Sequence, residues 1–509
     1  MDILAFHKKH DSTMVQIRDG QLIYSVEAEK DSNPRFAFFT EERLQTVQSM
    51  VTSNPDLIAL SGWNKFHAGY EGLEAEDIHH WQEQYRGRLL PHFSSSHERA
   101  HILCAYGLSP FPAGEPCYVL VWEGALGSFY KIDAHLNITR LGTPLLFPGR
   151  RFAYLFELGK PGHDDESKGG AMDVAGKLMA LTGFAEGPLQ ARERDLVEAI
   201  LNVNMLDTRK GDFRDQWVYN VGVEDAGFKR AAKALTEVIF QLFHQFAARE
   251  MTEGYPLLIS GGCGLNCTWN RRWEDSGLFA DVFVPPCTND TGVALGTAVD
   301  AQFHHTGNAK VSWDVYVGEA FEEDVPVSSE FEEIEGGTSE VARYLAVGKV
   351  IAWAHGRCEM GPRALGNRSL LAAPFPATHK ERLNEIKQRE GYRPIAPICL
   401  EEDMGLWFDR AQPSPYMLYF TQVIRPGIEA VMHVDGSSRV QSVNRGQNSA
   451  VYDLLRAFKD QTGIGVLCNT SLNFKGKGFI NRTSDLMTYV RERGIDGMVI
   501  DGRFYLLKK

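Results

Sequence analysis

Two segments of the chain share the same strand–loop–strand pattern. In the first, Ile3–Phe6 is apolar, and Asp19-Gly20 is a hairpin turn between alternating segments that end near Val26. In the second, Tyr118–Trp122 is apolar, and a glycine loop leads to a return strand at Ser128–Ile132. Two such beginnings predict a duplicated α/β domain in which each half opens on a hairpin. Hairpins with glycine turns are common, so the pattern alone does not identify the fold.

A compositional break divides the chain. At 509 residues it exceeds what one hydrophobic core normally supports, which predicts two or three domains. The segment Glu319–Glu335 contains eight acidic residues and no basic ones. We therefore predict two α/β domains, residues 1–330 and residues 331–509, the second beginning with a helix near Ser339 and a strand at Val350–Ala354.

The overall composition excludes several classes of protein. A hydrophobic content of 43% and a charged content of 23% are those of a soluble globular protein. A formal net charge of −13 argues against a nucleic-acid partner. No apolar run approaches the ~18 residues that span a bilayer, and the first residues lack the core of a signal peptide. The eight cysteines are too scattered for a disulfide framework. We expect a cytoplasmic protein with neither a membrane nor a nucleic-acid partner.

Residues 357–393 concentrate arginine and lysine around glycine turns. Such a concentration in an acidic chain predicts a site for phosphate or carboxylate, because the planar guanidinium binds these anions bidentately. The alternative is a solvated basic surface. Residues 361–369, Gly-Pro-Arg-Ala-Leu-Gly-Asn-Arg-Ser, disfavour it, since this is a tight-turn sequence rather than a helix with scattered charges.

Two histidines have the spacing of metal ligands. His97 and His101 are four residues apart in a predicted helix, so both imidazoles lie on one face and can reach one ion. Asp290 stands just before another predicted helix. A chance pair is common in a chain with 16 histidines, and an aspartate at this position is also a good helix N-cap. Spacing alone leaves both interpretations open.

Two loops that follow predicted strands are further candidates. The loop Ser260-Gly261-Gly262 offers a flexible backbone and a helix N-terminus to an anion or nucleotide. Asn469 lies in Asn-Thr-Ser after a strand and is either a pocket residue or part of a turn. The polar turn His10-Asp11-Ser12 has the same two interpretations.

Taken together, the stretches Gly361–Ser369, Lys387–Arg393 and Val466–Asn473 resemble the ATP-dependent O-carbamoyltransferases of antibiotic and nodulation-factor biosynthesis. The resemblance covers nearly the whole chain. It implies a duplicated actin-like, sugar-kinase-like domain followed by a YrdC-like twisted sheet. Within the family, Glu27–Arg35 and Phe93–His101 look most like the cephalosporin hydroxymethyl carbamoyltransferases.

The resemblance also implies roles for particular residues. Glu123 stands where the family commonly has an aspartate ligand, which leaves its role open. The implied metal is iron(II), with zinc or manganese as alternatives, and Mg²⁺ would accompany ATP. The implied residues are Arg363, Arg368, Lys387 and Arg393 for carbamoyl phosphate and ATP; Cys468 and Asn469 lining the same pocket; Ser260, Gly261 and Gly262 for the nucleotide; and His97, His101 and Asp290 for the metal.

The reaction that the resemblance implies has two stages. Carbamoyl phosphate loses phosphate, and the resulting carbamate attacks the α-phosphorus of ATP and releases pyrophosphate. The carbamoyl-adenylate then gives its carbamoyl group to a hydroxyl of a small natural product, for which a 3-hydroxymethyl cephem is one candidate. A different class of function is a kinase-like or regulatory nucleotide-binding protein of the same fold. The sequence leaves the acceptor, the metal and the oligomeric state open.

Overall fold

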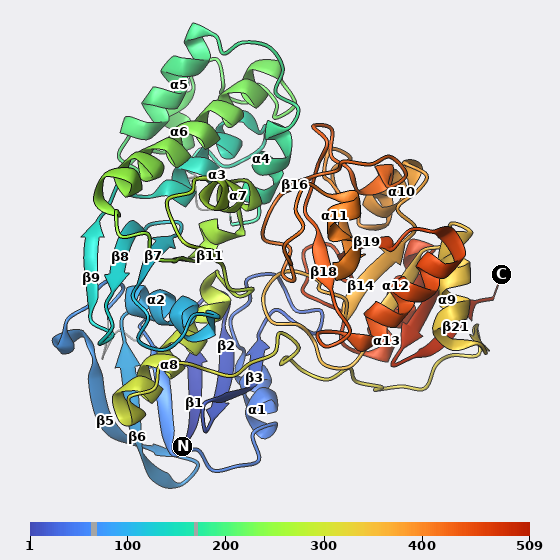
Figure 1. Ribbon diagram of the computed structural model, residues 1–509, viewed down its shortest axis with the longest axis horizontal. Coiled ribbons are helices and arrows are strands. Elements are labelled where there is room, and N and C mark those ends of the chain that lie inside the picture. The colour runs from blue at the N-terminus through green and yellow to red at the C-terminus, as the bar shows by residue number, and fades with distance from the viewer. Residues whose placement is uncertain (63–68, 167–171, 509) are drawn as a thin grey trace. The chain divides into compact units, whose positions relative to one another are not determined.

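The computed structural model describes residues 1–62, 69–166 and 172–508 (Figure 1). The chain divides into two compact units. The first unit combines Met1–Ala113, Pro285–Met432 and Gly436–Lys509, and the second holds Gly114–Val284 with His433–Asp435. The first unit is therefore discontinuous in sequence. All eight cysteines are free, as the sequence predicts. Among the described residues, no helix is both long and apolar enough to cross a bilayer.

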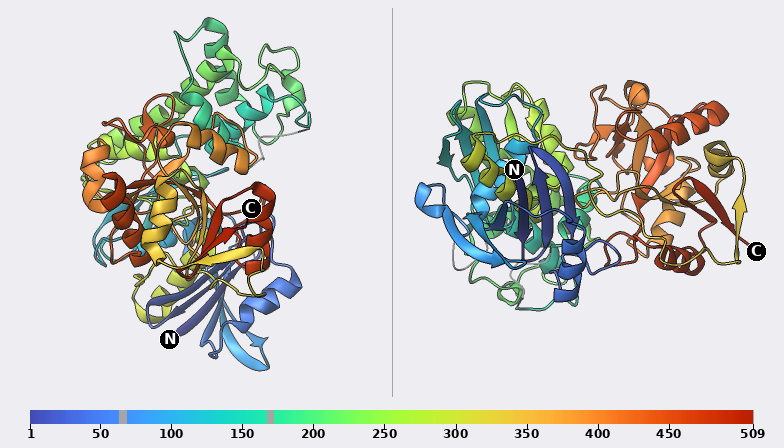
Figure 2. Two further views of the ribbon diagram at one scale, coloured as in Figure 1. Left: turned by 90° about the vertical axis from the view of Figure 1, so that its right-hand side faces the viewer. Right: turned by 90° about the horizontal axis from the view of Figure 1, so that it is seen from below.

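The first sheet of the first unit has six strands in the order β3-β2-β1-β4-β6-β5. Strands β1 to β3 form an antiparallel meander, while β4 is parallel to β1 and β6 is parallel to β4. The predicted hairpin turn is confirmed, because Asp19 and Gly20 have φ angles of 49° and 77°. The strands, which twist relative to one another in Figure 2, are β1 (Asp2–His7), β2 (Thr13–Arg18), β3 (Gln21–Glu27), β4 (Leu57–Ser61), β5 (His79–Tyr85) and β6 (Arg88–Ser95).

Two helices from distant parts of the sequence pack together against this sheet. They are α2 (His97–Leu108) and α8 (Val293–Thr306), and α8 contacts β1, β2, β4 and β6. A Cβ added to Gly296 would lie 1.7 Å from the Ala100 carbonyl oxygen, so the two helices are in backbone contact. This close packing fixes the start of α2 relative to the start of α8. The remaining helix of this part is α1 (Glu41–Ser49), whose Val47 packs with Leu4 and Phe6.

The sheet of the second unit repeats the arrangement of the first sheet. Its order is β11-β10-β7-β8-β9, again a meander of three antiparallel strands followed by two parallel ones. The duplication predicted from the two hairpin beginnings is therefore confirmed by the strand order. The strands are β7 (Cys117–Trp122), β8 (Gly127–Ile132), β9 (Ile138–Gly142), β10 (Leu257–Ser260) and β11 (Val282–Phe283).

The helices of the second unit pack around an aromatic core. Trp122 and Trp269 stack with ring centroids 4.4 Å apart, and the Phe243 ring packs on Trp122 with a centroid distance of 4.7 Å. The helices are α3 (Pro148–Gly159), α4 (Ala175–Thr182), α5 (Ala191–Asn202), α6 (Ala226–Glu250) and α7 (Cys267–Asp275).

The C-terminal part of the first unit contains an eight-stranded mixed sheet with helices on both faces. Its order is β12-β21-β20-β13-β14-β19-β15-β18. Helices α9 and α12 pack on one face, and α10 and α13 pack on the other. The elements, including the short ribbon β16–β17, are β12 (Phe331–Ile334), α9 (Gly337–Ala346), β13 (Ile351–Ala354), β14 (Arg368–Ala372), α10 (Thr378–Ile386), β15 (Ala396–Leu400), α11 (Met404–Trp407), β16 (Thr421–Gln422), β17 (Ser437–Ser438), β18 (Gln441–Val443), α12 (Ser449–Thr462), β19 (Val466–Ser471), α13 (Thr483–Arg493), β20 (Gly497–Ile500) and β21 (Arg503–Leu507).

These sheets confirm the expected α/β class. The predicted boundary at residue 330 falls immediately before β12, although the sheet that β12 begins belongs to the same compact unit as the first sheet. The division into residues 1–330 and 331–509 stays a prediction, as does the YrdC-like character of the last sheet.

Candidate functional site

The structure brings the three predicted metal ligands together. His97 begins α2, where the Ser96 hydroxyl oxygen caps the helix, and Asp290 opens the short turn before α8. The Nε2 atoms of His97 and His101 are 3.1 Å apart. The Asp290 Oδ1 atom lies 3.3 Å from His101 Nε2 and 3.8 Å from His97 Nε2. All three side chains are buried, so two imidazoles and one carboxylate converge on one point inside the first unit.

The electrostatics of this cluster favour a cation. Burial opposes ionisation of Asp290, but the imidazoles of His97, His101 and His10 outweigh it and hold the pKa of this carboxyl far below its usual range. A permanently ionised carboxylate beside two imidazoles is a donor set for a divalent transition metal. The residues present therefore fit the implied metal.

A further histidine lies behind the predicted ligands. His10 Nε2 is 3.4 Å from Asp290 Oδ2, and His10 Nδ1 is 3.3 Å from Asp11 Oδ2. Sequence reasoning left this turn between turn chemistry and a site. The signal that could have decided it is position, because the turn follows the buried strand β1, and ligands of α/β sheets gather beyond strand ends. Glu123, which opens the glycine loop after β7, belongs to the second unit.

A cluster of cations surrounds the end of α10. Lys387 follows that helix, and its ammonium donates hydrogen bonds to the carbonyl oxygens of Ser471 and Asn473 at 2.6 and 3.0 Å. Burial lowers the pKa of Lys387 well below its ordinary value, and the nearby guanidinium groups of Arg389 and Arg393 lower it further. Burial and Arg393 likewise lower the pKa of Arg389 to about 9.

Carboxylates balance the charges of this cluster only in part. Among the described residues no carboxylate forms an ion pair with Lys387, and the Glu390 carboxylate lies 3.9 Å from Arg393. Further guanidinium groups that act on these charges are those of Arg35, Arg439 and Arg493. Repulsion among buried cations favours a bound polyanion, which removes the repulsion.

Two predicted arginines, Arg363 in the loop between β13 and β14 and Arg368 at the start of β14, have different surroundings. Arg368 is fully buried, and its guanidinium donates to the carbonyl oxygens of His355 and Gly356 at 2.9 Å each and to Asn481 Oδ1 at 2.6 Å. Its donors are thus used within the protein, which favours a role in holding the loop. Arg363 lies half-buried two residues beyond the Gly361 turn.

The predicted pocket residues of β19 face different ways. Asn469 donates to the Ala364 carbonyl oxygen and to Gln441 Oε1, both at 3.1 Å, and so supports the loop that carries Arg363. The Cys468 thiol donates to the Ala373 carbonyl oxygen and lies in the hydrophobic core, where burial raises its pKa. The structure thus places Asn469 against the loop that carries Arg363 and Cys468 in the hydrophobic core.

The glycine loop after β10 is constrained by packing. Gly261 has φ 96°, and a Cβ on it would lie 2.5 Å from the Trp122 carbonyl oxygen at the end of β7. Ser260 is buried, and a short turn at Gly262–Leu265 separates the loop from α7. The loop lies beyond the carboxyl ends of two parallel strands, a usual place for ligands in α/β sheets, and nucleotide binding there stays a prediction.

One turn connects the basic loop to the rest of the first unit. Lys30 Nζ donates to the Gly361 carbonyl oxygen at 2.6 Å, and the Gly361 N–H donates to the Glu27 carboxylate. Gly361 has φ 83°, and a Cβ on it would lie 2.3 Å from the carbonyl oxygen of Pro286, four residues before Asp290. The basic loop is therefore packed directly against the loop that leads to a proposed metal ligand.

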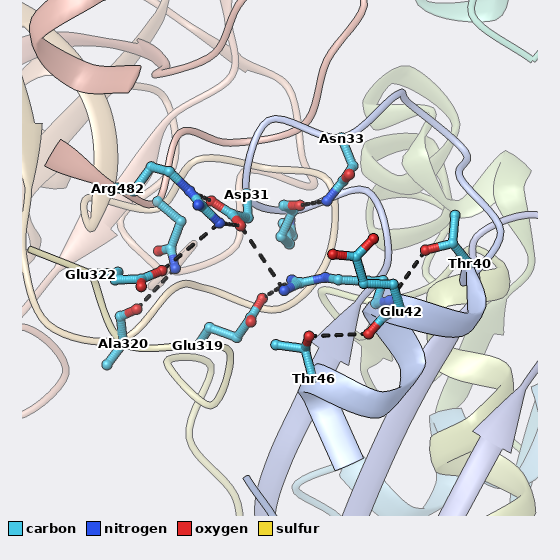
Figure 3. Close-up of polar contacts among 12 residues, drawn as sticks. Asp31, Asn33, Thr40, Glu42, Thr46, Glu319, Ala320, Glu322 and Arg482 are labelled. Atoms are coloured by element: carbon cyan, nitrogen blue, oxygen red, sulfur yellow. Dashed lines mark hydrogen bonds and ion pairs between the residues drawn. The ribbon is translucent and has the colours of Figure 1, made fainter. Parts of the chain in front are cut away.

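Ion pairs reinforce this connection (Figure 3). The Arg482 guanidinium, from the start of α13, pairs with the Asp31 carboxylate, and Arg43 of α1 pairs with Glu319. Burial raises the pKa of Glu319, and Arg43 opposes that rise. Paired and partly buried charges of this kind fix one segment against another.

Comparison with known proteins identifies the family. One family model, the carbamoyltransferase N-terminus, matches residues 83–299, and another, the carbamoyltransferase C-terminus, matches residues 342–508. The chain is 46% identical to a 3'-hydroxymethylcephem-O-carbamoyltransferase of Amycolatopsis lactamdurans over 99% of both chains. The chain belongs to the carbamoyltransferase family. The expectation of an enzyme of this family is thereby confirmed.

Other relatives agree with this assignment. The carbamoyltransferase is 43% identical to a 3'-hydroxymethylcephem-O-carbamoyltransferase of Streptomyces clavuligerus over 99% of both chains. It is 33% identical to nodulation protein U of Rhizobium tropici, over 94% of this chain and 92% of the relative. Among solved structures, full-length HypF in a phosphate- and nucleotide-bound form matches with a TM-score of 0.35 at 14% identity, over 61% of this chain and 56% of that one, which is too distant to define the fold.

Proposed function

We propose that this carbamoyltransferase uses ATP and carbamoyl phosphate to make a carbamoyl-adenylate, and then carbamoylates the hydroxyl of a 3-hydroxymethyl cephem. The observation that carries the first stage is the cluster of buried cations around Lys387, which carboxylates balance only in part. Two polyanionic substrates can approach each other only where cations offset their repulsion. Lys387, Arg389 and Arg393 supply such cations, and burial together with neighbouring guanidinium groups lowers the pKa of each.

The activation step joins carbamate to the adenylate part of ATP. Carbamoyl phosphate is hydrolysed to carbamate and phosphate, and a carbamate oxygen forms a bond to the α-phosphorus of ATP while the bond to pyrophosphate breaks. Lys387 and the two arginines would hold the phosphate oxygens, and Arg363 would reach them from the Gly361 turn. Asn469 and Arg368 would keep that loop in place through their contacts with Ala364 and with His355 and Gly356.

The transfer step belongs to the cluster of His97, His101 and Asp290. A divalent metal, which we propose to be iron(II), would supply Lewis-acid stabilisation of the leaving adenylate. The acceptor hydroxyl oxygen attacks the carbamoyl carbon, AMP leaves, and the hydroxyl proton must pass to a base. His10, held between Asp11 and Asp290, is placed to receive it. The same proposal has three further parts. The loop Ser260-Gly261-Gly262 contacts the nucleotide, Mg²⁺ accompanies ATP, and the protein is cytoplasmic.

The cephem acceptor rests on the two relatives whose names specify that reaction, at 46% and 43% identity over 99% of both chains. The deciding experiment is mass spectrometry of reactions with ATP, carbamoyl phosphate and a panel of hydroxylated acceptors. We expect a carbamoylated cephem that disappears when either co-substrate is omitted. Equal or faster modification of an aminoglycoside or a sugar would overturn the choice of acceptor. ATP turnover that ignores carbamoyl phosphate would favour a kinase-like activity instead.

A further inference from the structure

Three histidines meet on the surface of the first unit, at the end of α8 away from Asp290. His80 belongs to β5, and His304 and His305 lie in the last turn of α8. Figure 1 shows this end of α8 beside the β5–β6 hairpin. The imidazole centroid of His80 lies 6.0 Å from that of His304 and 6.2 Å from that of His305. All three residues are exposed.

A buried carboxylate orients one of these rings. His304 Nε2 is 3.5 Å from Asp300 Oδ1. Asp300 is fully buried, and the Arg99 guanidinium clamps it with hydrogen bonds of 2.6 and 3.0 Å. Histidines that bind metals commonly direct one ring nitrogen to a carboxylate, which fixes the ring and presents the other nitrogen to the ion. With Nε2 directed to Asp300, Nδ1 is the ligand atom that His304 offers.

The ring separations are within reach of a shared ion. A metal–nitrogen bond of about 2.0–2.1 Å places an imidazole centroid roughly 3 Å from the ion, so two ligating rings have centroids roughly 5–6 Å apart. The observed separation of 6.0 Å between His80 and His304 lies at the upper end of this range, and the separation of 6.2 Å between His80 and His305 lies just above it. The ring nitrogens of this trio do not converge as those of His97 and His101 do, so binding requires rotations of exposed side chains, which are fast.

The surroundings of His80 and His304 keep these two rings in the form that binds metal. Burial lowers the pKa of His80, and His305 and His79 lower it further, while Asp300 raises it. Burial also lowers the pKa of His304, against the pull of Asp300 and with the help of Arg99, His80 and His305. Neutral imidazole is the ligand, so rings that resist protonation compete less with protons for the metal.

We propose that His80, His304 and His305 form a second metal site that takes a divalent late first-row transition ion such as zinc. A set of imidazole nitrogens selects such ions and not Mg²⁺ or Ca²⁺, which require oxygen ligands. The site lies at the opposite end of α8 from Asp290, roughly 20 Å away for a helix of this length, so it is separate from the site proposed for catalysis. A bound ion would tie β5, which is the edge strand of its sheet, to α8.

The test measures the equivalents of zinc that bind to the 509-residue chain. Protein stripped by a chelator is dialysed against Zn²⁺ and analysed by elemental mass spectrometry. The triple variant His80→Asn, His304→Asn, His305→Asn is compared with wild type and with His135→Asn, an exposed histidine of the second unit that serves as the matched control. We expect wild type and the control to bind one equivalent more than the triple variant. Equal zinc content in all three proteins overturns the proposal.

A second comparison tests whether the two metal sites are independent. The variant His97→Asn is expected to lose one equivalent and to keep the one that the triple variant loses. Loss of both equivalents in His97→Asn would overturn a separate site. Because the trio lies outside the proposed catalytic machinery, the triple variant is expected to keep wild-type pyrophosphate release and circular dichroism. His80→Asn alone is expected to weaken zinc binding about tenfold or more, and unchanged affinity would remove His80 from the site.

Discussion

The two candidate sites of the first unit differ in the charges that surround their central side chains. The Asp290 carboxylate lies beside the imidazoles of His97 and His101, and its pKa is held low. Burial and neighbouring guanidinium groups lower the pKa values of Lys387 and Arg389. The first cluster therefore suits a cation as its ligand, and the second suits an anion.

The difference lies in how each cluster is stabilised without its ligand. Asp290 has imidazole partners inside the protein, so its charge is accommodated before a metal arrives. Among the residues that the structure describes, Lys387 donates to carbonyl, amide and hydroxyl oxygens, and the neighbouring guanidinium groups repel it. The side chains of the proposed metal cluster already have partners of favourable charge, whereas the cations of the basic cluster repel one another and a bound anion would relieve that repulsion. We therefore expect the two clusters to respond differently to mutation.

The largest expected effect separates the two half-reactions. We expect Lys387→Ala to reduce carbamoyl-phosphate-dependent pyrophosphate release by roughly 10- to 150-fold or more, because each charge-assisted contact contributes about 1.5–3 kcal/mol. We expect His97→Ala to retain pyrophosphate release and to lose carbamoylated product, since the basic cluster is intact. Pyrophosphate and product are measured in the same reactions. Lys380→Ala, a lysine of α10 outside the cluster, is the control.

A common loss of both signals in His97→Ala and Lys387→Ala would contradict the division of labour between the clusters. One shared site would then be the better explanation.

Metal content tests the cluster of His97, His101 and Asp290 separately from the basic cluster. Asp290→Asn preserves shape but removes the negative charge, so we expect the metal content of purified protein to fall about tenfold or more while folding persists. Elemental analysis measures this, with Asp314→Asn, an exposed aspartate of the same unit, as the control. Full metal content in Asp290→Asn would exclude this carboxylate as a ligand.

The Gly361 turn offers a way to disturb both clusters with one methyl group. Gly361→Ala adds a Cβ at φ 83° and 2.3 Å from the Pro286 carbonyl oxygen, so we expect a loss of more than about 1–2 kcal/mol of stability. Both pyrophosphate release and metal content are expected to fall, because the turn packs against the loop before Asp290. Denaturant unfolding measures the first effect. Gly405→Ala, whose Cβ would meet only ordinary contacts, is expected to change neither.

The smallest expected effect is the uptake of a proton when an anion binds to the basic cluster. Burial and Arg393 lower the pKa of Arg389 to about 9, and a bound anion favours the charged guanidinium and raises that pKa. Below pH 9 the group is already charged, so affinity is highest there, and affinity falls as pH rises through about 9. Calorimetry with sulfate at about pH 9, in two buffers of different ionisation enthalpy, is expected to show proton uptake. We expect Arg389→Gln to abolish this proton uptake. The control Arg343→Gln, on the exposed face of α9, is expected to keep it. Uptake that survives in Arg389→Gln would show that another group takes up the proton.

Local patterns in the sequence predict the parts of this molecule that depend on neighbouring residues. The Asp19-Gly20 hairpin, the buried strands and the helix that places His97 beside His101 all follow from turn chemistry and periodicity. Asp290 joins the cluster as the family resemblance implies, and its position agrees with the tendency of residues before helices of α/β domains to gather beyond the strand ends.

Long-range contacts were beyond the sequence. Nothing near Arg368 reveals that His355, Gly356 and Asn481 use its donors, or that Cys468 faces the core. The approach of His10 to Asp290 joins residues far apart in the chain. A sequence pattern defines chemistry that a side chain can perform, and only packing decides whether that side chain still has donors to offer.

The discontinuity of the first unit has a consequence for biosynthesis. The first sheet is made early, but α8, which covers one of its faces, begins only at Val293, after the whole of residues 114–284. At ribosomal rates of about 5–20 residues per second, the sheet waits roughly 10–35 s with that face uncovered. The inserted residues can meanwhile form their own continuous unit. A nascent chain paused just before residue 293 is therefore expected to be the species most in need of a chaperone.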